Sequence, residues 1–189
     1  MVLFINTIDQ RAILENRCFI PESELSTEVE TVRCIIENSL GQILLLQKDQ
    51  TSRSPSLFEF PGGKIEDLSS QHPTVEQQQK AAKYETLEET GLDLPIESFQ
   101  RLGEFQYNFL LEGKALRRRV HVLYVNLSEN NVTIVVNQTL NDQSESEDKH
   151  IGFIWVEKFE RRELDEQKRL SGNSRTEGYL GNFWSDESR

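Results

Sequence analysis

The sequence of 189 residues contains little cysteine, little proline and no long apolar run. Its longest purely aliphatic stretch, Ile43 to Leu46, is far shorter than the ~20 residues of a transmembrane helix, so we expect no membrane partner. Two cysteines, Cys18 and Cys34, are too few for a disulfide framework and predict reduced thiols in a cytoplasmic protein. Met1 to Ile5 is apolar but lacks the basic n-region of a signal peptide, and Asp9 follows closely, so a secretory signal is not expected.

Basic residues are also scarce, because 21 Lys and Arg face 32 Asp and Glu and leave a net charge of −11. A free-standing nucleic-acid-binding protein usually carries a basic footprint, so no nucleic-acid partner is expected. An acidic protein that handles phosphates needs metal ions or a local basic patch to offset repulsion. The 36 % of hydrophobic residues suffices for one globular domain.

Short β-rich runs surround one long helical pattern, which predicts an α+β fold. We expect an N-terminal extension over residues 1–29 that could contribute a strand, a main domain over 30–160, and a C-terminal helix with a polar tail over 161–189. The predicted strands cover 31–38 and 42–48 as a hairpin, 57–60, 101–111 and 116–127 as a second hairpin, 132–138 and 151–156, and the predicted helices cover 73–90 and 159–170.

The long helix carries three glutamates on one face near its C-terminus. At about 100° per residue, Glu85, Glu88 and Glu89 fall within an arc of roughly 100°. Like charges at this spacing, close to the negative end of the helix dipole, destabilise a helix unless a cation binds them. A hard divalent cation would reverse the sign, whereas a solvated acidic face is the plainer alternative. The helix does not neutralise the triplet itself, because Lys80 is spaced to pair with Glu76.

A strand that ends in a double glycine precedes this helix. Pro61-Gly62-Gly63 interrupts the run from Leu57 to Glu66, and glycine lets a backbone turn or approach a ligand closely. Together with the glutamates, this segment resembles the signature of the Nudix hydrolases. The resemblance covers about residues 30–160 and implies a Nudix-like α/β/α sandwich with a mixed β-sheet. The positions that match the signature are Gly63, Glu76, Glu85, Glu88, Glu89, Gly91 and Leu92.

Two features depart from the family signature. Twelve residues separate Gly63 from Glu76, more than the signature has, although lengthening a surface loop costs only about 0.8 kcal/mol. Tyr84 stands where the family has an arginine that holds the glutamates by ion pairing. Lys83 or Lys80 could replace that arginine in part. The substitution bears on activity more than on the fold.

The resemblance implies hydrolysis of a nucleoside diphosphate linked to another moiety, with Mg²⁺ or Mn²⁺ as cofactor. It makes Glu85 and Glu89 the expected direct ligands, with Glu88 as a ligand or a base that orients water. The Gly62 carbonyl could complete the coordination shell, while Glu76 would be peripheral.

In the family, the general base is either a signature glutamate or a carboxylate from a loop after the helix. In this sequence Glu145, Glu147 and Asp148 lie in such a loop, and Glu147 is the preferred candidate among them. Arg117 and Arg119 belong to the single basic cluster and are expected to share one strand face, where they could contact phosphate or simply be solvated. A pyrophosphohydrolase is the favoured function. The alternatives are a catalytically weak nucleotide-binding or regulatory Nudix-like module and an unrelated acidic metal-binding or interaction protein. A homodimer is compatible with the sequence.

Overall fold

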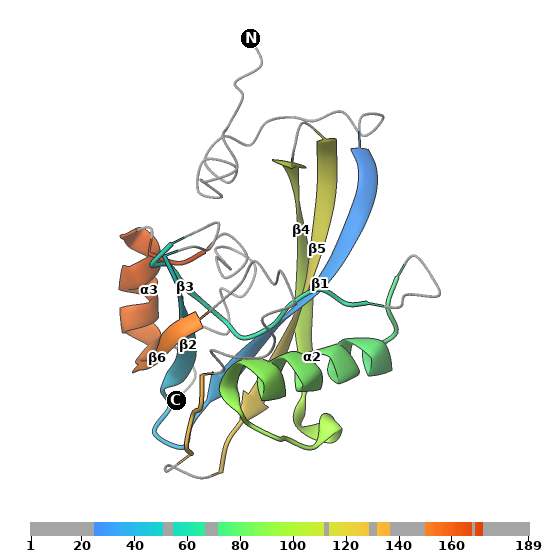
Figure 1. The fold of residues 1–189 in the computed structure, drawn as a ribbon. Coiled ribbons are helices and arrows are strands. Elements are labelled where there is room, and N and C mark those ends of the chain that lie inside the picture. Colours follow the sequence, from blue (N-terminus) through green and yellow to red (C-terminus); the bar gives the residue numbers. More distant parts are fainter. Residues whose placement is uncertain are drawn as a thin grey trace.

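A single mixed sheet forms the centre of the protein (Figure 1). The computed structural model describes residues 25–50, 55–66, 72–111, 114–128, 132–136, 150–167 and 169–171. The sheet has the strand order β3-β2-β1-β5-β4, with β6 paired to β2. The elements are β1 (Leu25–Glu37), β2 (Ile43–Lys48), β3 (Phe58–Glu59), α2 (Val75–Thr90), the 3₁₀ turn η2 (Ile96–Ser98), β4 (Gln100–Leu111), β5 (Lys114–Asn126), β6 (His150–Val156) and α3 (Lys158–Glu166).

The long pairing of the sheet joins β1 to β5 in parallel, whereas the other strand pairs are antiparallel. The predicted hairpin of β4 and β5 is confirmed. The predicted hairpin of β1 and β2 is correct only at its turn, where Asn38 Oδ1 accepts hydrogen bonds from the amides of Leu40 and Gln42. The two strands share one register pair, Glu37 with Ile43, and then diverge. The divergence leaves room for the segment 60–65 to lie beside β1.

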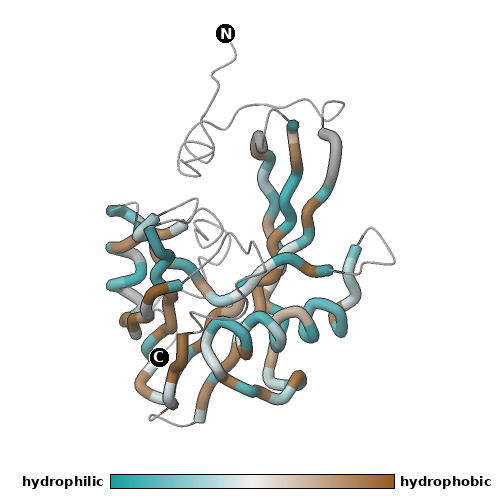
Figure 2. Tube along the Cα trace, viewed as in Figure 1, coloured by the Kyte–Doolittle hydropathy of each residue, from teal (hydrophilic) through white to brown (hydrophobic). Residues whose placement is uncertain are grey.

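The two helices cover opposite faces of the sheet, which confirms the α/β/α sandwich. Val32 and Cys34 of β1 pack in one core cluster with Ala82 of α2. Ile35 points to the other face and packs in a second cluster with Leu164 of α3. Figure 2 shows hydrophobic residues concentrated in the strands that pass between the helices, while α2 is mainly hydrophilic. This alternation along β1 is the period of two that a strand buried on both faces requires.

Helix α2 begins at Val75, two residues later than the predicted start at residue 73, and ends at Thr90 as predicted. Thr74 is the N-cap and forms a reciprocal capping box with Gln77. Gly91 follows the helix in a left-handed conformation, and its amide donates to the Leu87 carbonyl at 2.9 Å. The helix therefore ends directly after Glu88 and Glu89, which fixes both glutamates in its last turn.

Some boundaries differ from the prediction. Strand β1 begins at Leu25, so the end of the expected extension lies in the sheet. Residues 132–136 form no strand, because the Val135 amide donates to the Thr90 carbonyl at the end of α2 instead of joining the sheet. Helix α3 ends at Glu166 rather than at residue 170, and Leu170 forms an isolated bridge with Phe58. No helix in the described part of the chain has the length and apolar character needed to cross a membrane.

Candidate active site

The double glycine is held against β1 by backbone hydrogen bonds. The Cys34 amide donates to the Pro61 carbonyl at 2.8 Å, and the Val32 amide donates to the Gly63 carbonyl at 2.9 Å. Gly62 has a φ of 138°, and a Cβ there would overlap the Val32 carbonyl. Only glycine fits this position, because the backbone of the segment runs in direct contact with β1.

Two signature glutamates of α2 reach this glycine segment. The Gly62 amide donates to Glu89 Oε2 at 2.8 Å. A Cβ on Gly63 would overlap the carboxylate of Glu85, so this glycine is the contact surface for that side chain. Glu89 has a side-chain exposure of 13 %, whereas Glu88 is exposed. The structure thus brings Glu85, Glu89, Gly62 and Gly63 together and leaves Glu88 on the solvent side.

The environment of Glu89 disfavours its negative charge. Burial is the main cause, and the neighbouring carboxylates of Glu85 and Glu59 add to it, although His150 and Arg33 act in the opposite direction. These effects raise the pKa of Glu89 to about 8. The like charges of this site are therefore only partly compensated by the protein itself.

The donor set fits a hard divalent cation. Carboxylate and carbonyl oxygens are the ligands that Mg²⁺ and Mn²⁺ prefer, and an added positive charge would favour the ionised form of Glu89, which burial and the neighbouring carboxylates disfavour. The carbonyls of Pro61 and Gly63 both accept hydrogen bonds from β1. The Gly62 carbonyl, between them, accepts no such backbone bond in the described part of the chain. It remains the backbone oxygen suited to such a cation.

The lysines of α2 do not approach these glutamates. Lys80 Nζ lies 2.9 Å from Glu76 Oε1, the predicted i,i+4 pair, and Lys83 Nζ lies 2.8 Å from Asp93 Oδ1. Tyr84 is 68 % exposed on the helix surface. Both lysines therefore form ion pairs with other carboxylates. Among the described contacts of this helix, neither lysine replaces the signature arginine as an ion-pair partner of the glutamates.

A buried ionic group lies next to Glu89, and we call it the Glu59 network. Glu59 is 1 % exposed and accepts a hydrogen bond from Lys48 Nζ at 3.0 Å and one from Ser171 Oγ at 3.1 Å. Arg33 Nη2 lies 3.6 Å from Glu59 Oε2, and His150 Nε2 lies 2.9 Å from Glu59 Oε1. All five residues of the network are almost fully buried: Arg33, Lys48, Glu59, His150 and Ser171.

Opposing effects set the charges in this network. Burial would raise the pKa of Glu59, but Lys48, Arg33 and the hydrogen bond from His150 hold it well below its usual range. Burial would lower the pKa of His150, but its hydrogen bond with Glu59 and the charges of Glu89 and Glu59 raise it. The sequence predicts no role for these residues, because they come from distant positions and lack any metal-ligand spacing. In the sequence, Glu59 stands in the predicted strand 57–60, three positions before Gly62.

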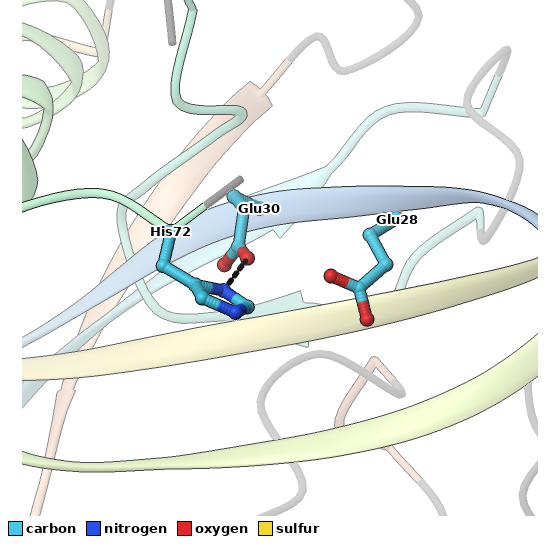
Figure 3. Close-up of side chains that lie close together, drawn as sticks. All are labelled: Glu28, Glu30 and His72. Atoms are coloured by element: carbon cyan, nitrogen blue, oxygen red, sulfur yellow. Dashed lines mark ion pairs between the residues drawn. The ribbon is translucent and has the colours of Figure 1, made fainter. Parts of the chain in front are cut away.

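The predicted phosphate-contacting arginines lie in a second charged group, the Glu30 network, on the α2 face of the sheet. Arg117 Nη1 lies 3.5 Å from Glu28 Oε1, and Arg119 Nη1 lies 3.3 Å from Glu30 Oε1. Figure 3 shows Glu28, Glu30 and His72, whose ligand atoms lie within 4.8 Å of one another. The Arg119 guanidinium contacts all three side chains and supplies the positive charge there. The network comprises Glu28, Glu30, His72, Glu104, Arg117, Arg119 and His121.

The remaining predicted residues have simpler positions. Glu76 is exposed in the first turn of α2, far along the helix from Glu85 and Glu89, and Gly91 caps its other end. Glu147, with Glu145 and Asp148, lies outside the described residues. The structure therefore gives no position for the preferred general base.

Comparisons with known proteins bear on the family and the fold of the chain. A family model described as NUDIX domain matches residues 27–170. No curated protein sequence matches the chain.

Solved structures with the same fold share little sequence identity with the chain. The NUDIX domain of Shewanella oneidensis NrtR, complexed with ADP ribose, has a TM-score of 0.53 at 13 % identity and covers 88 % of this chain and 92 % of that one. The MutT protein of Methanosarcina mazei has a TM-score of 0.51 at 21 % identity, covering 77 % and 86 %. A bifunctional NMN adenylyltransferase/ADP ribose pyrophosphatase of Francisella tularensis, complexed with AMP and a Mn ion, has a TM-score of 0.51 at 16 % identity, covering 89 % and 43 %.

Proposed function

Because the chain belongs to the Nudix family of hydrolases, which act on diphosphate anhydrides, we propose that it cleaves a nucleoside diphosphate linked to another moiety with Mg²⁺ or Mn²⁺. The observation that best supports this proposal is the packing of Glu85 and Glu89 against Gly62 and Gly63. Burial and the neighbouring carboxylates raise the pKa of Glu89 there to about 8. ADP ribose, the ligand of the Shewanella structure, is a nucleoside diphosphate linked to another moiety, and the Francisella structure holds AMP with a Mn ion.

Glu85 and Glu89 would hold the metal ion together with the Gly62 carbonyl. Glu88, on the solvent side of the same turn, would be an outer ligand or would orient the attacking water. When bound, the ion would lower the pKa of that water and offset the charge of the phosphates. The hydrogen bond from the Gly62 amide keeps the Glu89 carboxylate in a fixed orientation for this task.

Proton removal and substrate binding complete the proposal. Glu147 is the proposed general base, with Glu85 and Glu88 as the signature carboxylates that assist it. Arg117 and Arg119 are proposed to contact phosphate. Since both arginines pair with carboxylates of the Glu30 network, a phosphate would have to exchange with these partners.

One observation favours a second candidate, a Nudix-like module that binds a nucleotide but turns it over weakly. Tyr84 replaces the signature arginine and is 68 % exposed, and Lys80 and Lys83 pair elsewhere. This candidate predicts metal-dependent nucleotide binding without phosphate release. The two candidates therefore differ in turnover rather than in binding.

The test is a screen of nucleoside diphosphate derivatives with Mg²⁺ and with Mn²⁺, following products by chromatography. For the best substrate, Glu89→Gln and Glu85→Gln should each lower kcat at least about a hundredfold, because loss of a metal ligand removes several kcal/mol of charge stabilisation. Glu76→Gln is the matched control on the same helix, since its partner is Lys80 and it lies far from the glycine segment.

The control should retain kcat within about twofold. Metal-dependent binding of nucleotides without product, for every derivative tested, would establish the second candidate. Turnover that is unaffected by Glu85→Gln and Glu89→Gln would contradict both the metal site and the proposed function.

A further inference from the structure

We propose that His150, held in place by Glu59, is the residue that positions the Glu89 carboxylate for metal binding in this chain. The inference rests on the proposed function, because it assigns a role toward the proposed metal ligand. His150 would not touch substrate or metal ion. It would act through Glu89, as a positioning residue.

The first step is the position of the imidazole between two carboxylates. His150 Nε2 lies 2.9 Å from Glu59 Oε1, and His150 Nδ1 lies 3.6 Å from Glu89 Oε1, an ion-pair distance. Glu89 Oε2 accepts the Gly62 amide at 2.8 Å. The two oxygens of Glu89 therefore face different supports, one from the glycine segment and one from His150.

The second step is that His150 is the basic side chain in ion-pair contact with Glu89 among the described residues. The lysines on the same helix point elsewhere, since Lys80 pairs with Glu76 and Lys83 pairs with Asp93. Arg33 affects the charge of Glu89, but it forms an ion pair with Glu59. Loss of His150 would thus remove the direct support of Glu89 Oε1.

The third step is that the imidazole cannot easily turn away. His150 begins β6 and is paired with Lys48 of β2, and its side chain is 3 % exposed. Glu59, which is hydrogen-bonded to His150 Nε2, is itself held in place by Lys48, Arg33 and Ser171. An imidazole that is hydrogen-bonded to buried charged partners keeps its orientation better than a flexible surface side chain does.

A second buried histidine provides an internal control. His121 Nε2 lies 2.7 Å from Glu30 Oε2, and His121 Nδ1 lies 3.4 Å from Glu104 Oε2. It thus also lies between two carboxylates and has a side-chain exposure of 3 %, but neither carboxylate belongs to the glycine and glutamate site. A general effect of removing a buried histidine should appear at both positions, whereas a positioning effect should appear only at His150.

The experiment measures Mn²⁺ affinity by electron paramagnetic resonance in the full chain, together with thermal unfolding of each variant. His150→Phe keeps a flat ring and removes both nitrogens, and we expect the Kd for Mn²⁺ to rise about 10- to 100-fold. His150→Gln keeps one amide donor and should give an intermediate Kd. His121→Phe should leave the Kd within about twofold of the unchanged chain.

Wild-type nuclear magnetic resonance keeps the test decisive if His150→Phe does not fold. The chain has three histidines, so their ring nitrogens can be assigned from single substitutions. During a Mg²⁺ titration the Nδ1 resonance of His150 should shift and saturate with the metal, while the ring resonances of His121 should not. A histidine that has no contact with a metal ligand would show no such metal-dependent shift.

The outcomes separate this inference from the proposed function. Suppose that the unchanged chain binds Mn²⁺ and that Glu89→Gln weakens this binding. If His150→Phe then has the same Kd as the unchanged chain, and the ring resonances of His150 do not shift during the Mg²⁺ titration, the positioning role is wrong and the metal site stands. If the unchanged chain binds no Mn²⁺, both are overturned. Equal losses from His150→Phe and His121→Phe would also refute the specific role.

Discussion

The two buried histidines occupy networks that look alike but balance their charges differently. In the Glu30 network, Arg119 pairs with both Glu28 and Glu30, and His121 lies between Glu30 and Glu104. In the other region, the cations of the Glu59 network gather on Glu59, and Glu89 at its border has only His150 in ion-pair contact among the described residues.

The difference lies in how far each acidic cluster is already neutralised by the protein. Glu28, Glu30 and His72 have metal-like spacing, yet Arg119 already supplies a positive charge to all three. Burial, with a smaller contribution from the Glu85 and Glu59 carboxylates, raises the pKa of Glu89 to about 8, so the protein alone stabilises its negative charge poorly. The region with the poorer internal charge balance is the one that fits an added cation.

The largest expected effect separates the two networks by stability. Glu59→Gln leaves Arg33, Lys48 and His150 buried without their shared counter-charge, so we expect a loss of about 3–5 kcal/mol in the free energy of unfolding. Glu30→Gln should cost only about 1–2 kcal/mol, because Arg119 keeps Glu28 and is partly exposed. Urea unfolding measures both, and equal losses would remove the contrast.

A pH series should reveal the carboxyl of Glu89 in the metal-free protein. The folded chain holds this proton up to about pH 8, whereas an unfolded chain releases it near the ordinary value of 4.5. The contribution of Glu89 to stability is therefore lost as pH rises from about 4.5 to about 8, by a few kcal/mol at most. Urea unfolding should show this decline, and Glu89→Gln should flatten it; a parallel decline in the variant would assign it to other groups.

Metal ion should stabilise the region of Glu89 and leave the Glu30 network unaffected. At a hundred times its Kd, Mn²⁺ should raise the free energy of unfolding by about 2.7 kcal/mol. Gly63→Ala should abolish most of this gain, because its Cβ would overlap the Glu85 carboxylate. Glu30→Gln should retain it. Thermal unfolding with and without Mn²⁺ makes the measurement, and full stabilisation of Gly63→Ala would contradict the contact with Glu85.

The smallest expected effect concerns the surface of the Glu30 network. Arg117→Gln removes a partly exposed ion pair with Glu28 and should change stability by less than about 1 kcal/mol. If Arg117 contacts phosphate as proposed, KM should rise severalfold with little change in kcat. Steady-state kinetics on the best substrate tests this, and an unchanged KM would leave Arg117 a purely structural member of its network.

Local signals in the sequence determined much of this protein. The capping residues Thr74 and Gly91 set the ends of α2, because each satisfies backbone groups that a helix leaves unpaired. The i,i+4 spacing of Glu85 and Glu89 placed both on the side of its last turns that faces the glycine segment, with Glu88 on the solvent side, and the double glycine indicated where a backbone could approach them. These features depend on residues a few positions apart, so periodicity and turn chemistry suffice to predict them.

Only the tertiary structure decided which charges meet. His150 and Glu59 are separated by 91 positions, as are His121 and Glu30, and no local pattern indicates which of the two histidines contacts Glu89. Strand pairing makes the choice, since it places β6 beside β2 and lets β1 diverge from β2 to admit the glycine segment. Long-range contacts of this kind depend on how the whole sheet closes, which a short stretch of sequence does not encode.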